Sequence, residues 1–206
     1  MPARRSPVDD SATRTALLDA TEELMLEEGY AAVTTRRIGA KAGMNNALVF
    51  YYFGTVDNLF VELFRRGAER SLERLERALR SPQPLWAFWE LTHDFSGNAL
   101  IMEFTALANH RKAIRTEIAT YSRRFRVLQL ETLPRVLEGY GVDSERWPPA
   151  SLILLMAGFS RFMHIEEGFG LDLGHAETVA VIEREIRALE GDRRSAADGA
   201  VAGRTE

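Results

Sequence analysis

The chain has 206 residues, of which 46% are apolar and 27% are charged, and its net charge at pH 7 is −4. This composition is typical of a globular protein, and the absence of cysteine excludes disulfides and thiolate metal sites. The longest apolar run, residues 152–159, is far shorter than the roughly 20 residues that a membrane span needs. No secretory signal is recognisable, and we expect a soluble, cytoplasmic (nucleoid-associated) protein.

Apolar residues recur at helical spacing along the chain, which predicts an all-α fold of about nine helices. The first helix is expected at residues 11–28, because Gly29 ends the pattern, and residues 1–10 are expected to form a flexible arm. Short helices are expected from Thr34 or Thr35 to Ala42 and from Asn45 to residue 53, since these residue types cap helices. A long helix is then expected at residues 57–80.

The rest of the chain is also expected to be helical. The predicted helices cover residues 85–95, 98–110, 112–138, 150–167 and 176–190. Pro134 predicts a kink or an early end of the helix around it, because proline has no N–H and disrupts a helix interior. Residues 191–206 are small, polar and charged, and we expect them to form a disordered tail.

Two short helices joined by a glycine-containing turn predict a helix-turn-helix within residues 11–55. The third helix of such a unit must bury one face and present the other to the major groove of DNA. Val49 and Phe53, four residues apart, are expected to point inward. The candidate DNA-binding residues are Thr34, Thr35, Arg36, Arg37, Asn45, Asn46, Ala47, Leu48, Tyr51 and Tyr52.

These residue types suit DNA recognition. An asparagine can form two hydrogen bonds with adenine, and Ala47 or Leu48 can contact a thymine methyl group. Thr35, at the start of a helix, can offer its hydroxyl and its N–H to a phosphate. Such residues in a short helix can also lie on the protein surface or in the core without binding DNA. Arg36 as simply a solvent-exposed charge and Tyr52 as a packing residue are therefore both open alternatives.

Charge is the observation that argues against DNA binding, because residues 1–55 are slightly acidic in sum. The acids lie between Asp9 and Glu28. The next segment carries Arg36, Arg37 and Lys41, and only this segment must face DNA. The placement of the charges is therefore compatible with phosphate binding.

Residues 29–59 resemble the DNA-binding signature of the tetracycline-repressor (TetR) family. The resemblance rests on Gly29-Tyr30, on the segment TTRRIGAKAGMNNALVFYYF (residues 34–53) and on Leu59, and it extends over about residues 12–60. It implies a sequence-specific transcriptional regulator, a repressor that a small, largely apolar effector releases from its operator. It also implies that Arg36 reads a guanine.

The sequence departs from the family at two positions. The family usually has tyrosine at position 50 and lysine at position 56, both in contact with phosphate, whereas this chain has Phe50 and Val56. Losing a hydroxyl and a cation is expected to weaken non-specific DNA binding and to flatten its dependence on salt. Tyr51, Tyr52, Arg37 and an arm with Arg4 and Arg5 are candidates to compensate.

The resemblance implies that residues 56–190 bind a small molecule and dimerise. Aromatic, flexible and polar residues of the kind that line ligand pockets are concentrated in the first part of this range. The candidate effector-binding residues are Trp86, Trp89, His93, Phe95, Met102, Phe104, Leu107, His110, Tyr121 and Phe125. The alternative for each of them is ordinary helix-bundle core.

The helix expected at residues 150–167 is apolar on nearly all sides, so it must be buried all round. We expect a second subunit to cover one of its sides, in an interface that this helix forms together with the last helix of the chain. The candidate dimer residues are Leu152, Leu155, Met156, Phe159, Met163, Val179, Ile182 and Ile186. Twofold symmetry would predict a pseudo-palindromic operator; the alternative is a core within one chain.

Two other functions are open. An enzyme or metalloprotein is conceivable because His164 and Glu167 lie three residues apart, but there is no second such pair and no phosphate-binding loop. We expect no catalytic residues, cofactor or metal. A helical ligand- or protein-binding module that has lost specific DNA binding is the second alternative, and Phe50 and Val56 favour it.

Overall fold

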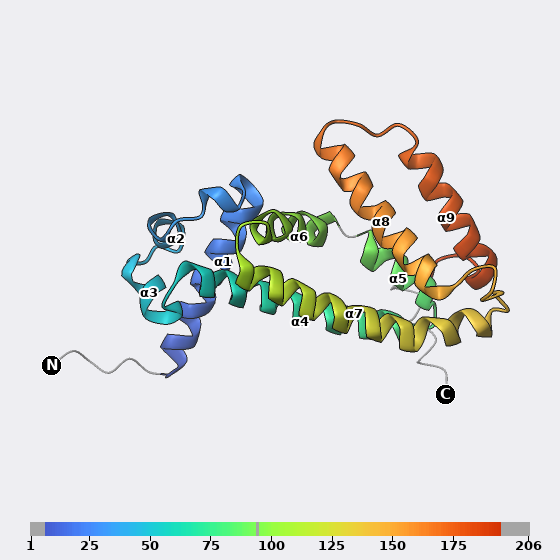
Figure 1. The fold of residues 1–206 in the computed structure, drawn as a ribbon, viewed down its shortest axis with the longest axis horizontal. Coiled ribbons are helices and arrows are strands. Elements are labelled where there is room, and N and C mark those ends of the chain that lie inside the picture. The colour runs from blue at the N-terminus through green and yellow to red at the C-terminus, as the bar shows by residue number, and fades with distance from the viewer. Residues whose placement is uncertain (1–6, 94, 195–206) are drawn as a thin grey trace. The chain divides into compact units, whose positions relative to one another are not determined.

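The computed structural model describes residues 7–93 and 95–194, and within these ranges the chain is all-α, as predicted. Figure 1 shows the order of the elements. They are α1 (Pro7–Glu28), the short 3-10 helix η1 (Tyr30–Ala32), α2 (Thr35–Lys41), α3 (Ala47–Phe53), α4 (Val56–Leu79), α5 (Pro84–Thr92), α6 (Phe95–Ala108), α7 (Lys112–Gly139), α8 (Pro149–Gly168) and α9 (His175–Glu190).

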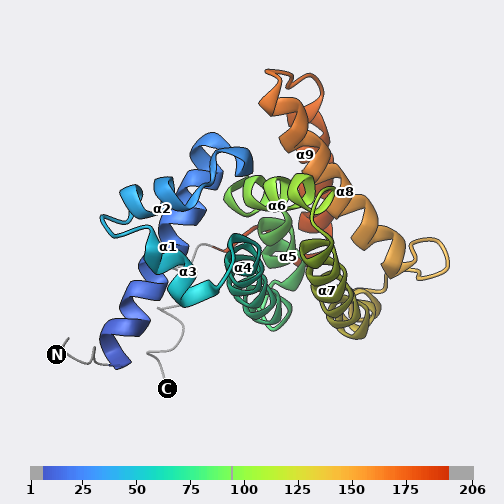
Figure 2. The ribbon, with the colours of Figure 1, turned by 60° about the vertical axis from the view of Figure 1, so that its left-hand side comes forward.

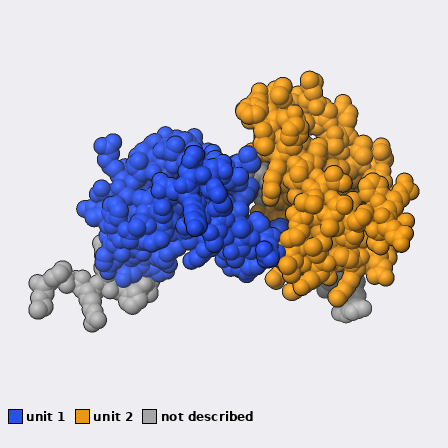
Figure 3. Space-filling view, viewed as in Figure 1, with its two compact units in different colours: residues 1–72, 95–125 blue, residues 73–94, 126–206 orange. Residues whose placement is uncertain are grey.

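The helices gather into two compact units (Figure 3). Unit 1 comprises residues 1–72 and 95–125, and unit 2 comprises residues 73–94 and 126–206. Helices α4 and α7 each contribute to both units. The units are bodies of contacting residues and differ from the functional domains predicted from the sequence, whose boundaries near residues 55 and 190 stay predictions.

Unit 1 is built around one apolar core. Leu17 of α1, Ile38 of α2, Val49 of α3 and Leu59 of α4 are all fully buried in it, and Ile114 of α7 joins them. Burial of each such side chain contributes about 1.5–3 kcal/mol. The shared core therefore fixes α2 and α3 against α1, and Figure 2 shows these three helices lying together.

Ion pairs on the surface of unit 1 connect α4 with α7. They are Asp57 with Arg111, the residue just before α7, Arg65 with Glu117, and Glu69 with Arg124. These pairs recur at intervals along both helices, so they fix the register of one helix against the other within this unit. The first half of α7 thus belongs structurally with the predicted DNA-binding segment.

Unit 2 has a core of its own. Helix α5 packs against α8 and α9, and its two tryptophans are buried beside Leu133, Ile153 and Ile186. The Glu190 carboxylate, at the end of α9, accepts hydrogen bonds from the N–H groups of Leu85 (2.8 Å) and Trp86 (3.0 Å). It thereby satisfies donors of the first turn of α5 that have no partner inside the helix.

Two expectations on helix ends, the start of the first helix at residue 11 and an early end at Pro134, are wrong. Helix α1 begins at Pro7 instead of residue 11, because proline suits the first turn of a helix, where its missing N–H costs nothing. Helix α7 continues past Pro134 to Gly139, because Leu133 and Leu137 are both buried in the core of unit 2 and hold it there. Residues 1–6, including Arg4 and Arg5, lie outside the described residues.

The beginning of the expected tail is held in place. The buried Gln83 side chain donates to the backbone oxygens of Glu190 (3.1 Å) and Asp192 (2.9 Å) and accepts from the N–H of Arg194 (2.8 Å). Residues 191–194 therefore pack against α5, contrary to the prediction of disorder from residue 191 onward. The remainder of the predicted tail, residues 195–206, is outside the described part.

Over the described residues, none of the helices alone is long and apolar enough to cross a membrane. Helices α3 and α4, bent by 65° at their junction, pass that test only when they are taken together.

Candidate nucleic-acid interface

Helix α2 begins at the cap that the sequence predicts. Thr34 has an extended backbone, and its hydroxyl oxygen accepts a hydrogen bond from the N–H of Arg37 at 3.3 Å. Thr35 is the first helical residue and is half-buried. The Thr34 side chain is thus already engaged in holding the helix start, while Thr35 lies beside it at the helix N-terminus.

The turn between α2 and α3 is tight because Gly39 lies against its backbone. A Cβ atom at Gly39 would lie 2.8 Å from the carbonyl oxygen of Met44 and 2.9 Å from the nitrogen of Asn46. The side-chain oxygen of Asn45 accepts from the N–H of Ala47 at 2.8 Å. The N-cap of α3 is Asn46 instead of the predicted Asn45, and its side chain makes no capping hydrogen bond. These contacts set the angle at which α3 leaves the turn.

Helix α3 has one buried face and one exposed face. Val49 and Phe53 point into the core, as predicted, and are 0% and 4% exposed. The exposed face carries Asn46, Ala47 and Tyr51, and Tyr51 is 71% exposed. These residues are available to a ligand as large as a DNA duplex.

Two other candidates on α3 have structural roles. Leu48 and Tyr52 are half-buried and pack against the core of unit 1. The Tyr52 hydroxyl donates a 2.8 Å hydrogen bond to the Asp10 carboxylate of α1, and the Tyr51 ring meets the Tyr52 ring edge-on. Tyr52 thus packs between the core of unit 1 and the exposed Tyr51 ring.

Phe50 belongs to the exposed face, although it is absent from the predicted set. It is 55% exposed. Its spacing from Asn46 and Ala47, four and three residues, places it on their side of the helix, so the spacing could have identified it. Val56, the second departure from the family pattern, is half-buried against the core and offers no charge.

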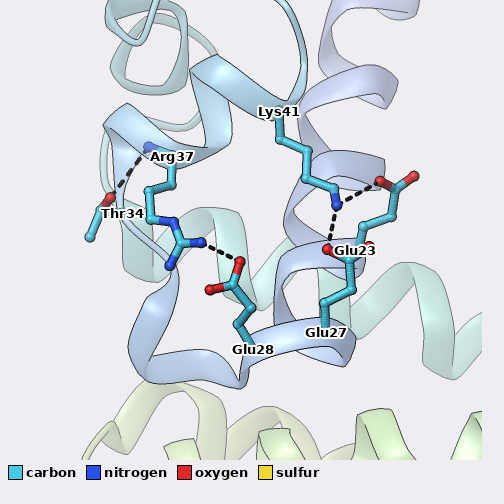
Figure 4. A network of polar contacts seen from close by, with 6 residues as sticks. All are labelled: Glu23, Glu27, Glu28, Thr34, Arg37 and Lys41. Atoms are coloured by element: carbon cyan, nitrogen blue, oxygen red, sulfur yellow. Dashed lines mark hydrogen bonds and ion pairs between the residues drawn. The ribbon is translucent and has the colours of Figure 1, made fainter.

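The cations of α2 differ in their surroundings. Arg36 is exposed and has no ion-pair partner among the described residues. Arg37 pairs with Glu28, and the Lys41 ammonium lies 2.5 Å from Glu27 and 3.3 Å from Glu23 (Figure 4). The carboxylates come from the end of α1, which faces α2.

These contacts change the ionisation of the groups involved. The hydrogen bond from Arg37 lowers the pKa of Glu28, and the same bond raises the pKa of Arg37. The hydrogen bond to Glu27, and after it the one to Glu23, raises the pKa of Lys41. Each of these shifts favours the charged form of its group, so Glu28, Arg37 and Lys41 are charged at neutral pH.

Residues 17–63 match the family model described as "Bacterial regulatory proteins, tetR family". The matched range runs from α1 into α4 and contains both helices of the helix-turn-helix, together with the turn at Gly39. This segment is therefore a DNA-binding region of the TetR type.

Curated relatives of this chain are transcriptional regulators. The repressor BepR of Brucella suis is 24% identical, over 90% of this chain and 97% of that protein. The repressor AcnR of Corynebacterium glutamicum is 33% identical over 61 residues, which are 30% of this chain and 32% of AcnR. The family is one of DNA-binding regulators and not of enzymes.

Solved structures share the fold. A TetR transcription regulator from Haloarcula marismortui has a TM-score of 0.63 at 19% identity, over 76% of this chain and 88% of that one. A transcriptional regulator from Saccharomonospora viridis, solved in complex with choline, has a TM-score of 0.66 at 18% identity, over 76% and 85%. At these identities the likeness concerns the fold alone.

The residues predicted to line an effector pocket fall into two groups. Trp86, Trp89 and His93 belong to unit 2, where the Trp89 and His93 rings stack at 4.7 Å. The others belong to unit 1. Phe104 and Leu107 are buried in its core, and His110 is exposed. The half-buried ones are Met102, Tyr121 and Phe125. The side chain of Phe95 lies outside the described residues.

A surface hollow of about 460 Å³ in unit 2 shares one residue, Trp86, with the predicted pocket. Its other lining residues are mostly polar, and they are Ser81, Gln83, Ala87, Glu90, Arg193 and Arg194. The predicted effector pocket remains a prediction.

The residues predicted for a dimer interface also divide. Met163 and Ile186 are buried inside unit 2, at 3% and 7% exposure, so they pack within the chain. Leu155 is 61% exposed. The remaining five are half-buried; they are Leu152, Met156, Phe159, Val179 and Ile182. Two exposed apolar residues of α8, Leu154 and Phe162, were not predicted.

Glu167, which the sequence analysis paired with His164, also lies near a second histidine, His175. His175, nearly buried, lies 2.8 Å from Glu166 and 3.8 Å from Glu167. Among the described residues no group of three or more histidines and carboxylates is arranged to hold a metal.

Proposed function

We propose that this chain is a sequence-specific repressor of transcription, acting as a homodimer that a small molecule releases from its operator. The observation that carries the proposal is the exposed face of α3. The buried pair on the opposite face holds the helix rigidly against α1 and α2, while small, amide and aromatic side chains face solvent. Such a face fits the major groove, where side chains reach base edges.

Each candidate on this face has a definite part in the proposal. Asn46 contacts an adenine, and Ala47 contacts a thymine methyl group. Tyr51 bonds a phosphate through its hydroxyl. Thr35, at the N-terminus of α2, bonds another phosphate, and Arg36 reads a guanine as the family resemblance implies.

Dimerisation is proposed through α8 and α9. Leu154, Leu155 and Phe162 form an exposed apolar stripe along α8, and an exposed apolar surface of this kind is typical of an interface. A twofold dimer has two recognition helices, so the operator would be a pseudo-palindrome with half-sites about one helical turn apart, or a multiple of it.

Release by a small, largely apolar effector is the third part of the proposal. The choline complex of the Saccharomonospora viridis regulator supports small-molecule binding in this fold. The effector would bind one conformation of the dimer better than the DNA-binding one, and its differential affinity sets how far DNA affinity falls. The cytoplasm, where the nucleoid lies, is the proposed location.

A second candidate function is a helical ligand- or protein-binding module without specific DNA binding. The observation that favours it is the ion pairing of Arg37 and Lys41, together with the loss of a hydroxyl at position 50 and of a cation at position 56. In this alternative the exposed face of α3 meets protein.

Selection of bound duplexes from random double-stranded DNA tests the proposal. Wild-type protein is expected to enrich a pseudo-palindrome, whereas the variant Asn46→Ala with Tyr51→Ala is expected to enrich none. The substitution Asn109→Ala, at an exposed position outside the interface, serves as the control. If folded wild-type protein enriches no sequence at low salt, the repressor proposal is wrong and the second candidate stands.

A further inference from the structure

Unpaired positive charge is scarce in the DNA-binding segment. Between residues 10 and 60 the structure describes four cations, which are Arg14, Arg36, Arg37 and Lys41. Three of them are paired with carboxylates of the same chain: Arg14 with Glu62, and the other two with the end of α1. Within these residues only Arg36 has no ion pair.

The pairing on α2 follows from the geometry of the helix junction. Glu23 and Glu27 are one helical turn apart on α1, so they lie on the same face and both reach the Lys41 ammonium (Figure 4). Glu28 reaches Arg37 of the same short helix. Three carboxylates thus surround two cations, and the cluster carries a net negative charge.

We propose that Glu23, Glu27 and Glu28 restrain the binding of non-specific DNA by holding Arg37 and Lys41 in ion pairs within the chain. This inference rests on the proposed DNA-binding function and concerns the surface formed by α2 and the end of α1. The partner is the phosphate backbone of any duplex, whatever its sequence.

The physical basis is competition for the same cations. A cation that neutralises a phosphate releases a condensed counterion, and this release supplies essentially all of non-specific affinity. Here Lys41 or Arg37 must first leave a carboxylate, and the freed carboxylate then repels the duplex. Both effects are independent of sequence, so they lower the affinity for unselected DNA and flatten its salt dependence.

The pairs can be exchanged with solvent, because they are not buried. The Lys41 side chain is 24% exposed and that of Glu27 is 57% exposed. Exposed pairs of this kind contribute little to stability. Replacing the carboxylates is therefore expected to free the cations without unfolding the protein.

The test measures binding to an unselected 20-base-pair duplex by fluorescence anisotropy at several salt concentrations. The variant Glu23→Gln with Glu27→Gln and Glu28→Gln is expected to bind about tenfold more tightly at low salt. The slope of log K against log salt is expected to steepen by about 2, because each of two additional phosphate contacts contributes about 0.9.

A matched variant controls for the change in total charge. Glu73→Gln, Glu131→Gln and Glu138→Gln remove the same three charges at exposed positions outside unit 1, and their slope is expected to match that of the wild type. Circular dichroism and thermal melting check that each variant is folded. An equal slope in both triple variants would overturn the proposal.

A second comparison separates the restraint from a structural role. Lys41→Gln is expected to leave the wild-type slope almost unchanged, since Lys41 is already engaged. In the variant with Glu23→Gln and Glu27→Gln, the same substitution is expected to reduce the slope by about 0.9, which is one phosphate. Equal effects of Lys41→Gln in both backgrounds would contradict the proposal.

The outcomes also distinguish this inference from the proposed function. A wild type that selects an operator while the slopes stay equal would refute the restraint and leave the repressor standing. A wild type that selects no sequence while the slopes differ as expected would refute the repressor and support the restraint. Absence of all duplex binding, in wild type and variants, would refute both.

Discussion

The N–H of Tyr30 donates a 2.7 Å hydrogen bond to the Glu103 carboxylate. Tyr30 begins η1, which joins α1 to α2, whereas Glu103 lies on α6, more than seventy residues later in the chain. The preceding Gly29 has a φ of +81°, and a Cβ atom there would lie 3.3 Å from the same carboxylate. Helix α6 thus supports the connection that positions the helix-turn-helix.

Replacing Glu103 with alanine is expected to destabilise the protein by about 1–3 kcal/mol, because a partly buried N–H loses its charged acceptor. Urea unfolding followed by circular dichroism measures this difference. Glu103→Gln retains an oxygen acceptor and is expected to cost less than the alanine variant. Equal losses in the two variants would show that the hydrogen bond is not the cause.

Gly39→Ala is expected to destabilise the protein by about 1–3 kcal/mol and to abolish operator binding. The added methyl group would meet backbone atoms of the turn, which cannot move aside as a flexible side chain does. Gly67→Ala, in the middle of α4 with open space around it, is the control and is expected to stabilise by about 0.5–1 kcal/mol. Thermal melting and duplex binding check both variants.

The helices of unit 1 were predictable because local signals agree there. The inward pair Val49 and Phe53 is correct, and the first helix ends before Gly29 as predicted. Recognition of the family depended on the same residues. Propensity and periodicity carry this information over a few residues at a time.

Contacts between distant residues were not predictable. Nothing local links Lys41 to Glu27, and Gln83 binds a segment more than 100 residues away. The buried and exposed faces of α8 were not predictable for a different reason, because a helix that is apolar on nearly all faces has no periodic pattern of apolar residues. The sequence could not tell that Met163 is buried and Phe162 exposed.

Acidification is expected to weaken the connection between α4 and α7. The Arg65 guanidinium donates to Glu117 at 2.9 and 2.5 Å, and these hydrogen bonds lower the pKa of Glu117. A carboxyl group whose pKa is lowered by folding stabilises the protein above its unfolded pKa, about 4.3. This contribution is lost as the pH falls through the lowered, folded value.

Comparison with Arg65→Gln isolates this contribution. At pH 7 the wild type is expected to be more stable by about 0.2–1 kcal/mol, the range for an exposed pair. Once the pH has fallen below the lowered pKa of Glu117, so that both proteins carry a protonated Glu117, the difference is expected to disappear. Urea unfolding at a series of pH values measures it, and a difference that stays constant with pH would refute the assignment.

Phe162→Glu is expected to convert a dimer into a monomer. Phe162 is 57% exposed within unit 2, and a charge at that position would be buried without a partner in the proposed interface. Analytical ultracentrifugation gives the mass, and operator affinity is expected to fall because each half-site then binds alone. Leu26→Glu places the same charge at an exposed position of α1 and is expected to leave the mass unchanged.

Arg36→Ala is expected to relax the sequence preference of the protein at one base pair of each half-site. Arg36 is exposed and is the one cation between residues 10 and 60 without an ion pair among the described residues. An arginine that bonds a guanine contributes about 1–3 kcal/mol of discrimination against the wrong base. The salt dependence should change little if Arg36 contacts the base alone, because Arg36 then neutralises no phosphate and releases no counterion.

The matched variant is Arg70→Ala, which removes an exposed arginine of α4 in the same unit. Competition titrations with operators altered at single positions measure the preference of each protein. The expected result is that only Arg36→Ala loses the preference for guanine. If Arg36→Ala instead weakens binding to all duplexes equally and flattens the salt dependence, then Arg36 binds a phosphate, and sequence recognition must come from α3 alone.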